Sequence, residues 1–225
     1  MTMPAISAVV PTLNEAVRLP ATLAALSGGV GEVVVVDGGS VDGTASVAAR
    51  AGARVVSAEP GRGGQLAAGA DAATGEWLLF LHADTVLDPQ WRAEAAAFTA
   101  DPGNASRAAY FAFALDDLSP AARRIERAVA WRCRFLGMPY GDQGLLIARP
   151  FYQRVGGFQP LPLMEDVDLV RRIGRRNLVP LAVRAVTSAQ RWRRDGWIAR
   201  GARNLSCLSL YFLGVPPRLL VRLYR

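Results

Sequence analysis

The sequence predicts an α/β fold: a mostly parallel sheet flanked by helices, with a helical C-terminal tail. Three observations lead to this prediction. Strand-like and helix-like segments alternate from the N-terminus to Leu81, as in a parallel sheet whose crossovers are helices. The apolar residues from Trp77 to Leu81 run without a polar break, which is typical of a strand buried on both faces. The run stops at His82, Ala83 and Asp84, so a carboxylate stands where open α/β sheets bind ligands.

The composition predicts one sizeable folded domain. The chain has 225 residues, 51% of them hydrophobic, and can therefore bury a substantial core. Its net charge is +7 and all 26 basic residues are arginine, which suits an anionic partner: a nucleotide, a phosphorylated acceptor or an acidic membrane. No patch of interleaved basic and aromatic residues points to nucleic acid in particular, so we do not expect it as a partner.

The cysteines and the apolar runs indicate a cytoplasmic protein. Cys133 and Cys207 lie far apart, and without a secretory signal we expect reduced thiols, although the sequence leaves a disulfide open. Strand-like residues begin almost at once, so we expect no signal peptide. The longest apolar run near the C-terminus is broken by polar residues and is too short to span a bilayer. With a single histidine, His82, a structural zinc site is not expected.

Each element follows from its local pattern. The expected strands are β-branched or continuous apolar runs between turn residues: 6–10, 32–36, 54–57, 77–81, 108–115, 144–148 and 180–187. The expected helices lie between Gly, Pro or acidic boundaries: 19–26, 44–52, 61–74, 89–100, 119–136, 165–175 and a tail after 190. We expect strand 108–115 to run antiparallel at the sheet edge.

Three acidic residues follow three of these strands. Glu15, Asp37 and Asp84 all stand at expected carboxyl ends, and a carboxylate after the second strand of such a fold commonly binds a nucleoside. A tight turn would explain Asp37 and its glycines, and capping of the next helix would explain Asp84. Neither alternative explains why three acids recur at one edge. The first turn lacks GxGxxG and the chain lacks lysine, which argues against NAD and P-loop sites.

In combination these motifs resemble a known family. Pro11-Thr-Leu-Asn-Glu15, Asp37-Gly-Gly-Ser-Val-Asp-Gly-Thr44 and His82-Ala-Asp84 resemble the family-2 glycosyltransferases with the GT-A (Rossmann-like) fold, in residues and in spacing. The resemblance covers nearly the whole chain. It is strongest to a small bacterial "transferase 2" subgroup with Leu-His-Ala-Asp-Thr and a late Arg-Trp-Arg-Arg.

The resemblance implies a domain plan and a reaction. One GT-A domain would span 1–225: 1–115 would bind the nucleotide-sugar, 116–195 would face the acceptor and 196–225 would form the tail. The enzyme would move a sugar from a nucleotide-sugar, most often a UDP-sugar, to an acceptor hydroxyl with inversion. It would use Mn²⁺ or Mg²⁺. A nucleotidyltransferase on a related sheet, or a catalytically inactive nucleotide-sugar-binding protein, is the alternative.

The resemblance also assigns donor residues. Asp37 would bind the nucleoside at the uracil, and Asp84 would bind the metal that bridges the diphosphate. His82 stands where the family usually has aspartate, and we interpret it as a structural hydrogen-bonding residue, with metal ligation as the alternative. The other residues assigned to the nucleotide-sugar frame the base and ribose or lie beside them: Pro11, Leu13, Glu15, Arg62, Gly64 and Ala83.

An acidic pair and a late basic motif complete the expected site. Glu165-Asp166 resembles the family's acidic pair, and Asp166 would be the catalytic base, with Glu165 and Asp168 as rivals. Otherwise these acids only favour a helix N-terminus. Gly141-Asp-Gln-Gly144 resembles the acceptor-side loop. In Gln190-Arg-Trp-Arg-Arg194, Trp192 would stack on a sugar and Arg191 would hold the diphosphate; a core tryptophan is the alternative.

Two segments combine apolar residues with arginines at helical spacing. They are the stretch from Ser119 to Leu136 and the tail from Asn204 onward. This pattern predicts contact with an anionic membrane surface at the inner face, where a lipid-linked acceptor would be reachable. The alternative is packing on the body of the protein or on a second subunit of a homodimer, since apolar residues at helical spacing are usually core.

Overall fold

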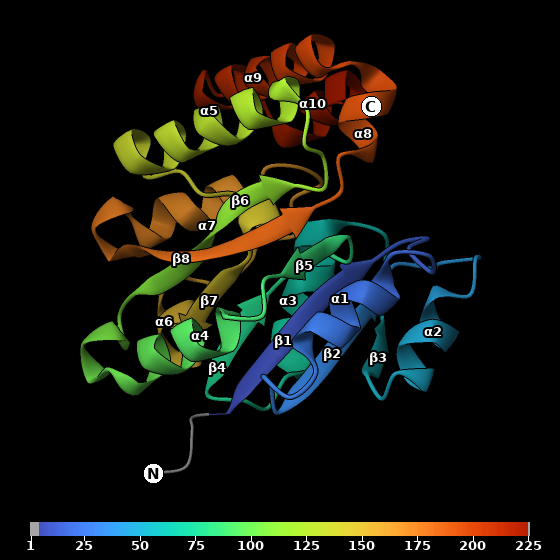
Figure 1. The fold of residues 1–225 in the computed structure, drawn as a ribbon, viewed down its shortest axis with the longest axis vertical. Coiled ribbons are helices and arrows are strands. Elements are labelled where there is room, and N and C mark those ends of the chain that lie inside the picture. The colour runs from blue at the N-terminus through green and yellow to red at the C-terminus, as the bar shows by residue number, and fades with distance from the viewer. Residues whose placement is uncertain (1–4, 225) are drawn as a thin grey trace.

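An eight-stranded sheet organises residues 5–224, the part of the chain that this computed structural model describes (Figure 1). Its strand order is β3-β2-β1-β4-β7-β6-β8-β5. The strands are β1 Ile6–Thr12, β2 Glu32–Asp37, β3 Arg54–Ser57, β4 Trp77–Phe80, β5 Thr85–Leu87, β6 Ala108–Leu115, β7 Leu145–Ala148 and β8 Leu178–Thr187.

Ten α-helices and three short 3₁₀ turns surround the sheet in the described residues. The helices are α1 Leu19–Leu26, α2 Thr44–Arg50, α3 Arg62–Ala72, α4 Trp91–Ala100, α5 Pro120–Leu136, α6 Arg149–Arg154, α7 Glu165–Ile173, α8 Gln190–Asp195, α9 Trp197–Phe212 and α10 Pro217–Tyr224. The 3₁₀ turns are η1 Pro102–Asn104, η2 Gly141–Gln143 and η3 Arg175–Asn177. The predicted fold, a mostly parallel sheet with flanking helices and a helical tail, is confirmed.

The first four strands are parallel, and β1 lies between β2 and β4. All residues of β1 and β4 are buried, as their continuous apolar runs predict for strands covered on both faces. Since the carboxyl ends of these parallel strands meet at one edge, the loops with Glu15, Asp37 and Asp84 lie along that edge. Strand β5 separates Asp84 from α4, so the alternative that Asp84 caps the helix is wrong.

Strand β6 corrects one prediction about the sheet. It lies inside the sheet, antiparallel to β7 and parallel to β8, and it runs in the same direction as β1 to β4. The reversed strand next to β4 is β7, and the short strand β5 forms the edge. The sequence of β6 is apolar on both faces, with Ala108, Ala109 and Phe111 fully buried, and such a strand would be exposed at an edge.

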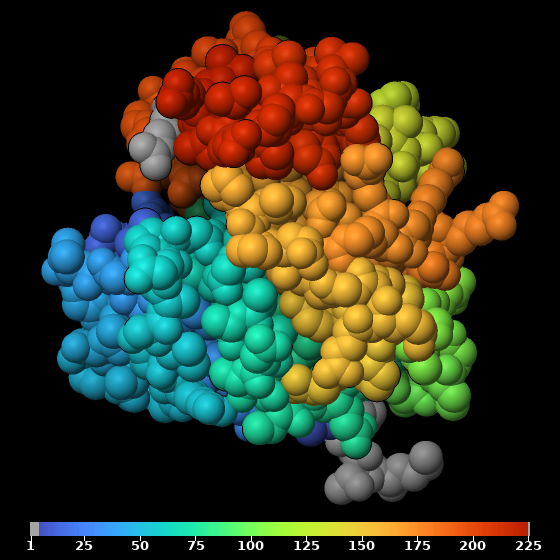
Figure 2. Space-filling model, turned by 180° about the vertical axis from the view of Figure 1, so that it is seen from behind, coloured from blue at the N-terminus to red at the C-terminus, as the bar shows by residue number. Residues whose placement is uncertain are grey.

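The C-terminal helices form a layer at one end of the sheet, with α5, α9 and α10 together at the top of Figure 1. On the opposite side of the molecule, a hollow separates this layer from the N-terminal half (Figure 2). Cys207 of α9 and Leu220 of α10 are buried against Met164 and Val167 at the start of α7. The inner face of the tail therefore packs on the body of the protein.

Two further sequence expectations concern the cysteines and the membrane. Cys133 and Cys207 are both buried free thiols, so they form no disulfide. Within 5–224, no helix has both the length and the apolar character that crossing a bilayer requires.

Candidate active site

Asp37 is a buried carboxylate held by hydrogen bonds at the end of β2. Its oxygens accept from the Thr12 hydroxyl at 3.1 Å, the Ser40 N–H at 2.9 Å and the Gly39 N–H at 3.2 Å. Burial raises the pKa of Asp37, but these hydrogen bonds outweigh burial, so the pKa lies below its ordinary value. Asp37 is therefore a preorganised, ionised acceptor at neutral pH.

Gln65 supports Asp37 from helix α3, and the sequence interpretation missed it. Its side-chain N–H group donates to the carbonyl oxygens of Thr12 and Val36, each at 2.8 Å. These contacts tie α3 to the carboxyl ends of β1 and β2. A polar side chain among the buried residues of α3 is the only local signal of this role.

The three residues predicted at the end of β1 and in the loop after it differ in exposure, and only Leu13 is at the surface. Pro11 is buried within β1, whereas Leu13 is 47% exposed. The Glu15 carboxylate forms an ion pair with Arg18 at 2.9 Å, and the Glu15 N–H donates to the Thr44 hydroxyl at 2.8 Å. The first and second acidic loops are thus joined directly.

Arg62 begins α3 and reaches the acidic pair. Its Nη1 lies 3.4 Å from Oε1 of Glu165. Burial lowers the pKa of Arg62, but Glu165 and, more weakly, Tyr224, Asp166 and Asp84 raise it above its ordinary value. These charges therefore act on one guanidinium.

Two glycines in the first turn of α3, Gly63 and Gly64, differ in the space around them. A side chain at Gly63 would collide with the backbone oxygen of Gln159, whereas a Cβ at Gly64 would meet nothing within 4 Å. Close packing at the start of α3 therefore requires Gly63, while the predicted residue Gly64 lies in open space.

His82 and Asp84 follow β4 but have different surroundings. Burial lowers the pKa of His82 well below its ordinary value, and the charges of Arg62 and Arg191 lower it further, so the imidazole is neutral. Its Nε2 faces Gly141, where a Cβ would stand only 2.7 Å away. Asp84 is partly exposed, and its carboxylate forms no hydrogen bond or ion pair with any residue in 5–224. Ala83 is buried between them.

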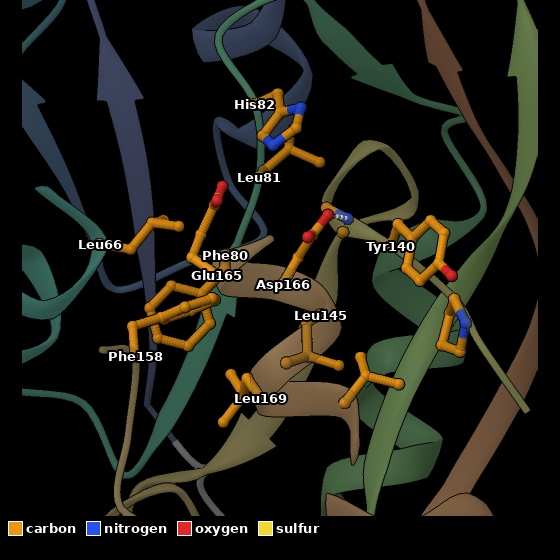
Figure 3. A pocket seen from close by; sticks show the side chains of 14 residues that line it. Leu66, Phe80, Leu81, His82, Tyr140, Leu145, Phe158, Glu165, Asp166 and Leu169 are labelled. Atoms are coloured by element: carbon orange, nitrogen blue, oxygen red, sulfur yellow. Dashed lines mark hydrogen bonds between the residues drawn. The ribbon is translucent and has the colours of Figure 1, made fainter. Parts of the chain in front are cut away.

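Glu165 and Asp166 occupy the first turn of α7 (Figure 3). Asp166 accepts through Oδ2 from the Gly141 N–H at 2.8 Å and through Oδ1 from the Val167 N–H at 2.7 Å. Glu165 is only 1% exposed, and burial together with the Asp166 charge raises its pKa, which Arg62 partly offsets. Asp166 is the more accessible member of the pair.

His82, Glu165 and Asp166 point toward one small cavity, about 20 Å³ in volume, which Tyr140 also lines. The structure thus brings together residues from after β4, from η2 and from the start of α7. Asp168, the remaining rival for the catalytic base, instead forms an ion pair with Arg172 at 2.6 Å.

Asp142 is a titratable residue that sequence reasoning did not assign. It belongs to η2, the predicted acceptor-side loop, and its Oδ1 is buried without a hydrogen-bond partner among the described residues. Burial raises its pKa to about 6, with Arg132 opposing the shift and the Asp166 charge adding to it. The motif Gly-Asp-Gln-Gly was the available signal, but nothing in it indicates burial.

Arg191 and Trp192, the two predicted site residues of α8, lie in different environments. Arg191 is exposed, and its charge lowers the pKa of His82. The Trp192 ring stacks on Trp197, with centroids 5.9 Å apart and planes at 21°, and packs on an apolar cluster beside α5. Arg191 thus acts on the site electrostatically, and the Trp192 ring is engaged in packing.

Comparison with known proteins now identifies the family. The model of glycosyl transferase family 2 matches residues 7–144. The chain belongs to this family. The predicted family, the family-2 glycosyltransferases, is therefore confirmed.

Relatives share part of the sequence. An uncharacterized glycosyltransferase of Mycobacterium tuberculosis is 46% identical over 85 residues, which cover 37% of this chain and 38% of that protein. A PGL/p-HBAD biosynthesis glycosyltransferase of Mycobacterium bovis is 40% identical over 97 residues, covering 39% of this chain and 38% of that protein. The match thus spans well under half the length of these curated relatives.

Solved structures share the fold. Glucosyl-3-phosphoglycerate synthase from Mycobacterium tuberculosis, in complex with Mn²⁺ and UDP-glucose, superimposes with a TM-score of 0.66 at 19% identity, covering 95% of this chain and 80% of that one. The complex of that enzyme with Mn²⁺, UDP and glucosyl-3-phosphoglycerate gives 0.60 at 22% identity, over 82% and 71% of the two chains. At these identities the similarity establishes the GT-A fold.

Proposed function

We propose that the enzyme transfers a sugar from a UDP-sugar to an acceptor hydroxyl with inversion, together with a divalent cation. The observation that carries this proposal is the position of Asp166. Gly141 holds it at the cavity that His82 lines, next to Glu165, whose ion pair with Arg62 reaches the start of α3. The solved enzyme with the same fold binds UDP-glucose and Mn²⁺, which supports the choice of donor.

The donor's nucleoside lies at the ends of β1 and β2 in this proposal. Asp37 is ionised and held by four hydrogen bonds, and it accepts from the base when the Ser40 hydroxyl turns away from its Oδ1. Leu13 and Glu15 flank it from the neighbouring loop. Arg62 and Arg191 lie toward the diphosphate, where their charges offset that of the departing UDP.

Asp84 suits a divalent cation. Its carboxylate is not engaged by other described residues, and Mg²⁺ or Mn²⁺ in such sites takes one or two carboxylates together with substrate phosphates. Within 5–224, no group of three His, Cys, Asp or Glu side chains is placed to hold an ion by itself, which fits ligands shared with the diphosphate. When bound, the cation neutralises charge on the diphosphate. His82 is the second proposed ligand, since a neutral imidazole is the form that binds metal.

Asp166 acts as the general base. It takes the proton of the acceptor hydroxyl while the hydroxyl oxygen attacks the anomeric carbon. The carbon–oxygen bond to the diphosphate breaks as the new glycosidic bond forms, and attack from the face opposite the diphosphate inverts the configuration. The N–H groups of Gly141 and Val167 each orient one carboxylate oxygen, and each oxygen keeps a further lone pair for the acceptor hydroxyl.

Asp84→Ala tests the proposal directly. We expect the variant to lose the Mn²⁺-dependent part of UDP binding, measured by isothermal titration with and without the metal, and to keep its fold. Asp88→Ala is the matched control, because Asp88 pairs with Arg184 outside the site. Equal metal-dependent affinity in Asp84→Ala and wild type would contradict the assignment. Metal-dependent hydrolysis of UDP-sugars by the wild type separates an active enzyme from an inactive binding protein.

The division of labour along the chain is part of the same proposal. Residues 1–115 bind the donor, 116–195 face the acceptor and 196–225 form a tail that supports the start of α7. The placement of Asp37 and Asp84 before 115, and of η2 and α7 after it, supports this division.

The outer face of the C-terminal layer contacts an anionic membrane surface in this proposal. Trp131, Leu205, Leu213 and Leu219 are exposed large apolar side chains on α5, α9 and α10 or directly after α9, and the sequences of these three helices contain several arginines. We expect flotation with anionic vesicles at low salt, reduced when Leu205 and Leu213 are both replaced by serine. Protein that stays in the dense fraction would contradict the membrane contact.

A further inference from the structure

A second cavity lies beside the catalytic one, between the end of α5, helix α7 and the end of α9. Its volume is about 230 Å³, and its walls are mainly apolar, formed by Leu136, Met138, Val167, Val170 and Phe212. Leu136 and Phe212 are 47% and 45% exposed, so the groove opens to the surface between α5 and α9. We call this cavity the α7 groove.

The α7 groove adjoins the catalytic cavity. Tyr140 and Val170 line both. On α7, Asp166 faces the catalytic cavity, while its neighbour Val167 faces the groove. A molecule in the groove therefore lies against Tyr140, next to the cavity that Asp166 lines.

Two guanidinium groups line the groove without a carboxylate partner in the described residues. The guanidinium carbon of Arg171 lies 5.2 Å from the ring centroid of Phe212 and 5.9 Å from that of Tyr211, within the range of cation–π contacts. Arg175 donates to the backbone oxygen of Arg134 at 3.2 Å, and its stem packs where a side chain on Gly137 would collide. The groove thus combines apolar walls with uncompensated positive charge.

The order of acidic, apolar and basic side chains from Asp166 to Arg175 indicates which kind of ligand fits the groove. The base at position 166 comes first, the apolar positions 167 and 170 follow, and the arginines at 171 and 175 come last. At the helical rise per residue, Arg171 lies about 8 Å from Asp166 along the axis of α7, and Arg175 follows in η3, beyond the end of that helix. A matching molecule carries a hydroxyl, then a hydrocarbon segment, then an oxyanion.

We propose that the acceptor is an anionic lipid of this kind, with its hydroxyl at Asp166, its hydrocarbon segment in the α7 groove and its carboxylate or phosphate on Arg171 and Arg175. This inference rests on the proposed transferase activity for the role of the hydroxyl. A free sugar or polyol acceptor would find few polar partners along these walls, and paired guanidiniums are suited to planar or phosphate oxyanions.

Binding of 10-hydroxydecanoate to the full chain tests the inference. We expect the wild type to bind it, to bind its neutral methyl ester about tenfold more weakly, and to bind acetate not measurably. In Arg171→Gln/Arg175→Gln, the affinity for the carboxylate falls to that for the ester. In Phe212→Ser, the affinities for both fall, because the hydrocarbon segment loses a wall.

Matched controls lie next to the altered residues. Arg176→Gln removes an exposed arginine beside Arg175, and Ile198→Ser removes an exposed apolar side chain from α9, both outside the groove. We expect neither to change the affinity for 10-hydroxydecanoate. Unchanged affinity in the double arginine variant, a loss in Ile198→Ser equal to that in Phe212→Ser, or equal binding of acetate would overturn the inference.

Two further measurements distinguish the groove proposal from the proposed membrane contact and from the proposed donor. If the double arginine variant lowers flotation with anionic vesicles but leaves monomeric 10-hydroxydecanoate binding intact, the arginines serve the membrane surface and the inference is wrong. UDP binding with Mn²⁺ is expected to be unchanged in every groove variant. A wild type that binds UDP but not 10-hydroxydecanoate overturns the groove assignment alone, whereas one that binds the carboxylate but not UDP overturns the proposed donor.

Discussion

The carboxylates on the two sides of the site are held in opposite ways. Asp37, on the donor side, receives hydrogen bonds from Thr12, Gly39 and Ser40, and its pKa is lowered. On the acceptor side, burial and a neighbouring carboxylate raise the pKa of Glu165 and of Asp142. The proposed donor side is thus a preformed acceptor of hydrogen bonds, whereas the proposed acceptor side gathers two carboxyl groups with raised pKa values around Asp166. Each prediction below tests one side of this difference.

The largest expected effect is on turnover, from the acceptor side. Asp166→Asn keeps an oxygen for the Gly141 N–H but cannot take a proton, so we expect kcat to fall by about 10²–10⁴. UDP affinity is expected to stay at the wild-type value, measured by titration calorimetry. Asp168→Asn, which changes an acid paired with Arg172, is the control and should keep most activity. Wild-type turnover in Asp166→Asn would move the base to Glu165.

An intermediate effect is expected on the donor side. Asp37→Ala leaves the Thr12 hydroxyl and the Ser40 N–H without their acceptor, so we expect a loss of about 1–3 kcal/mol in the free energy of unfolding. UDP affinity should fall about tenfold or more, since the nucleoside loses a charged acceptor. Denaturant unfolding and calorimetry measure the two effects. Glu59→Ala, an exposed acid near the end of β3, should change neither.

The smallest expected effect is a dependence of stability on pH. The folded protein binds protons on Asp142 and Glu165 more tightly than the unfolded chain, because their pKa values are raised, to about 6 for Asp142. Their contribution to the free energy of unfolding is therefore greatest at low pH and declines as pH rises from about 4 to about 6 or above. Asp37 contributes with the opposite sign, since its pKa is lowered and its stabilisation is lost in acid.

The variant Asp142→Asn isolates the contribution of Asp142 to this pH dependence. We expect the difference in unfolding free energy between the variant and the wild type to grow in favour of the variant between pH 4 and pH 6, measured by urea denaturation. His82 contributes in the opposite direction over part of this range, because its pKa is lowered, but it cancels in the difference. A difference that is constant between pH 4 and pH 6 would contradict the raised pKa of Asp142 in the folded protein.

Local sequence patterns predicted the strands and the acidic edge of the N-terminal half. Continuous apolar runs predict strands that are buried on both faces, and each of the first four strands is found within one or two residues of its expected limits. Because parallel strands present their carboxyl ends at a common edge, the spacing of Glu15, Asp37 and Asp84 predicted a shared acidic edge. The same patterns did not predict the support from Gln65, since its partners are backbone oxygens of distant strands.

The acceptor side depended on contacts between segments far apart in the chain. The apolar run of β6 fits an interior strand, but only its pairing with β7 and β8 shows which strands flank it. Likewise, the position of Glu165 and Asp166 at the start of a helix does not predict which of the two side chains is buried. The accessible Asp166 and the buried Glu165 differ because η2 and Arg62 approach them from other elements.

The sequence by itself therefore determined the fold class, the family and the acidic edge, because these follow from periodicity and from motifs within short segments. The tertiary structure alone decided which carboxylates have raised pKa values, that the tail packs on the start of α7, and that a groove with two arginines adjoins the cavity lined by Asp166. The physical reason is that desolvation, charge coupling and cavity shape are set by neighbours in space, which local sequence patterns do not specify.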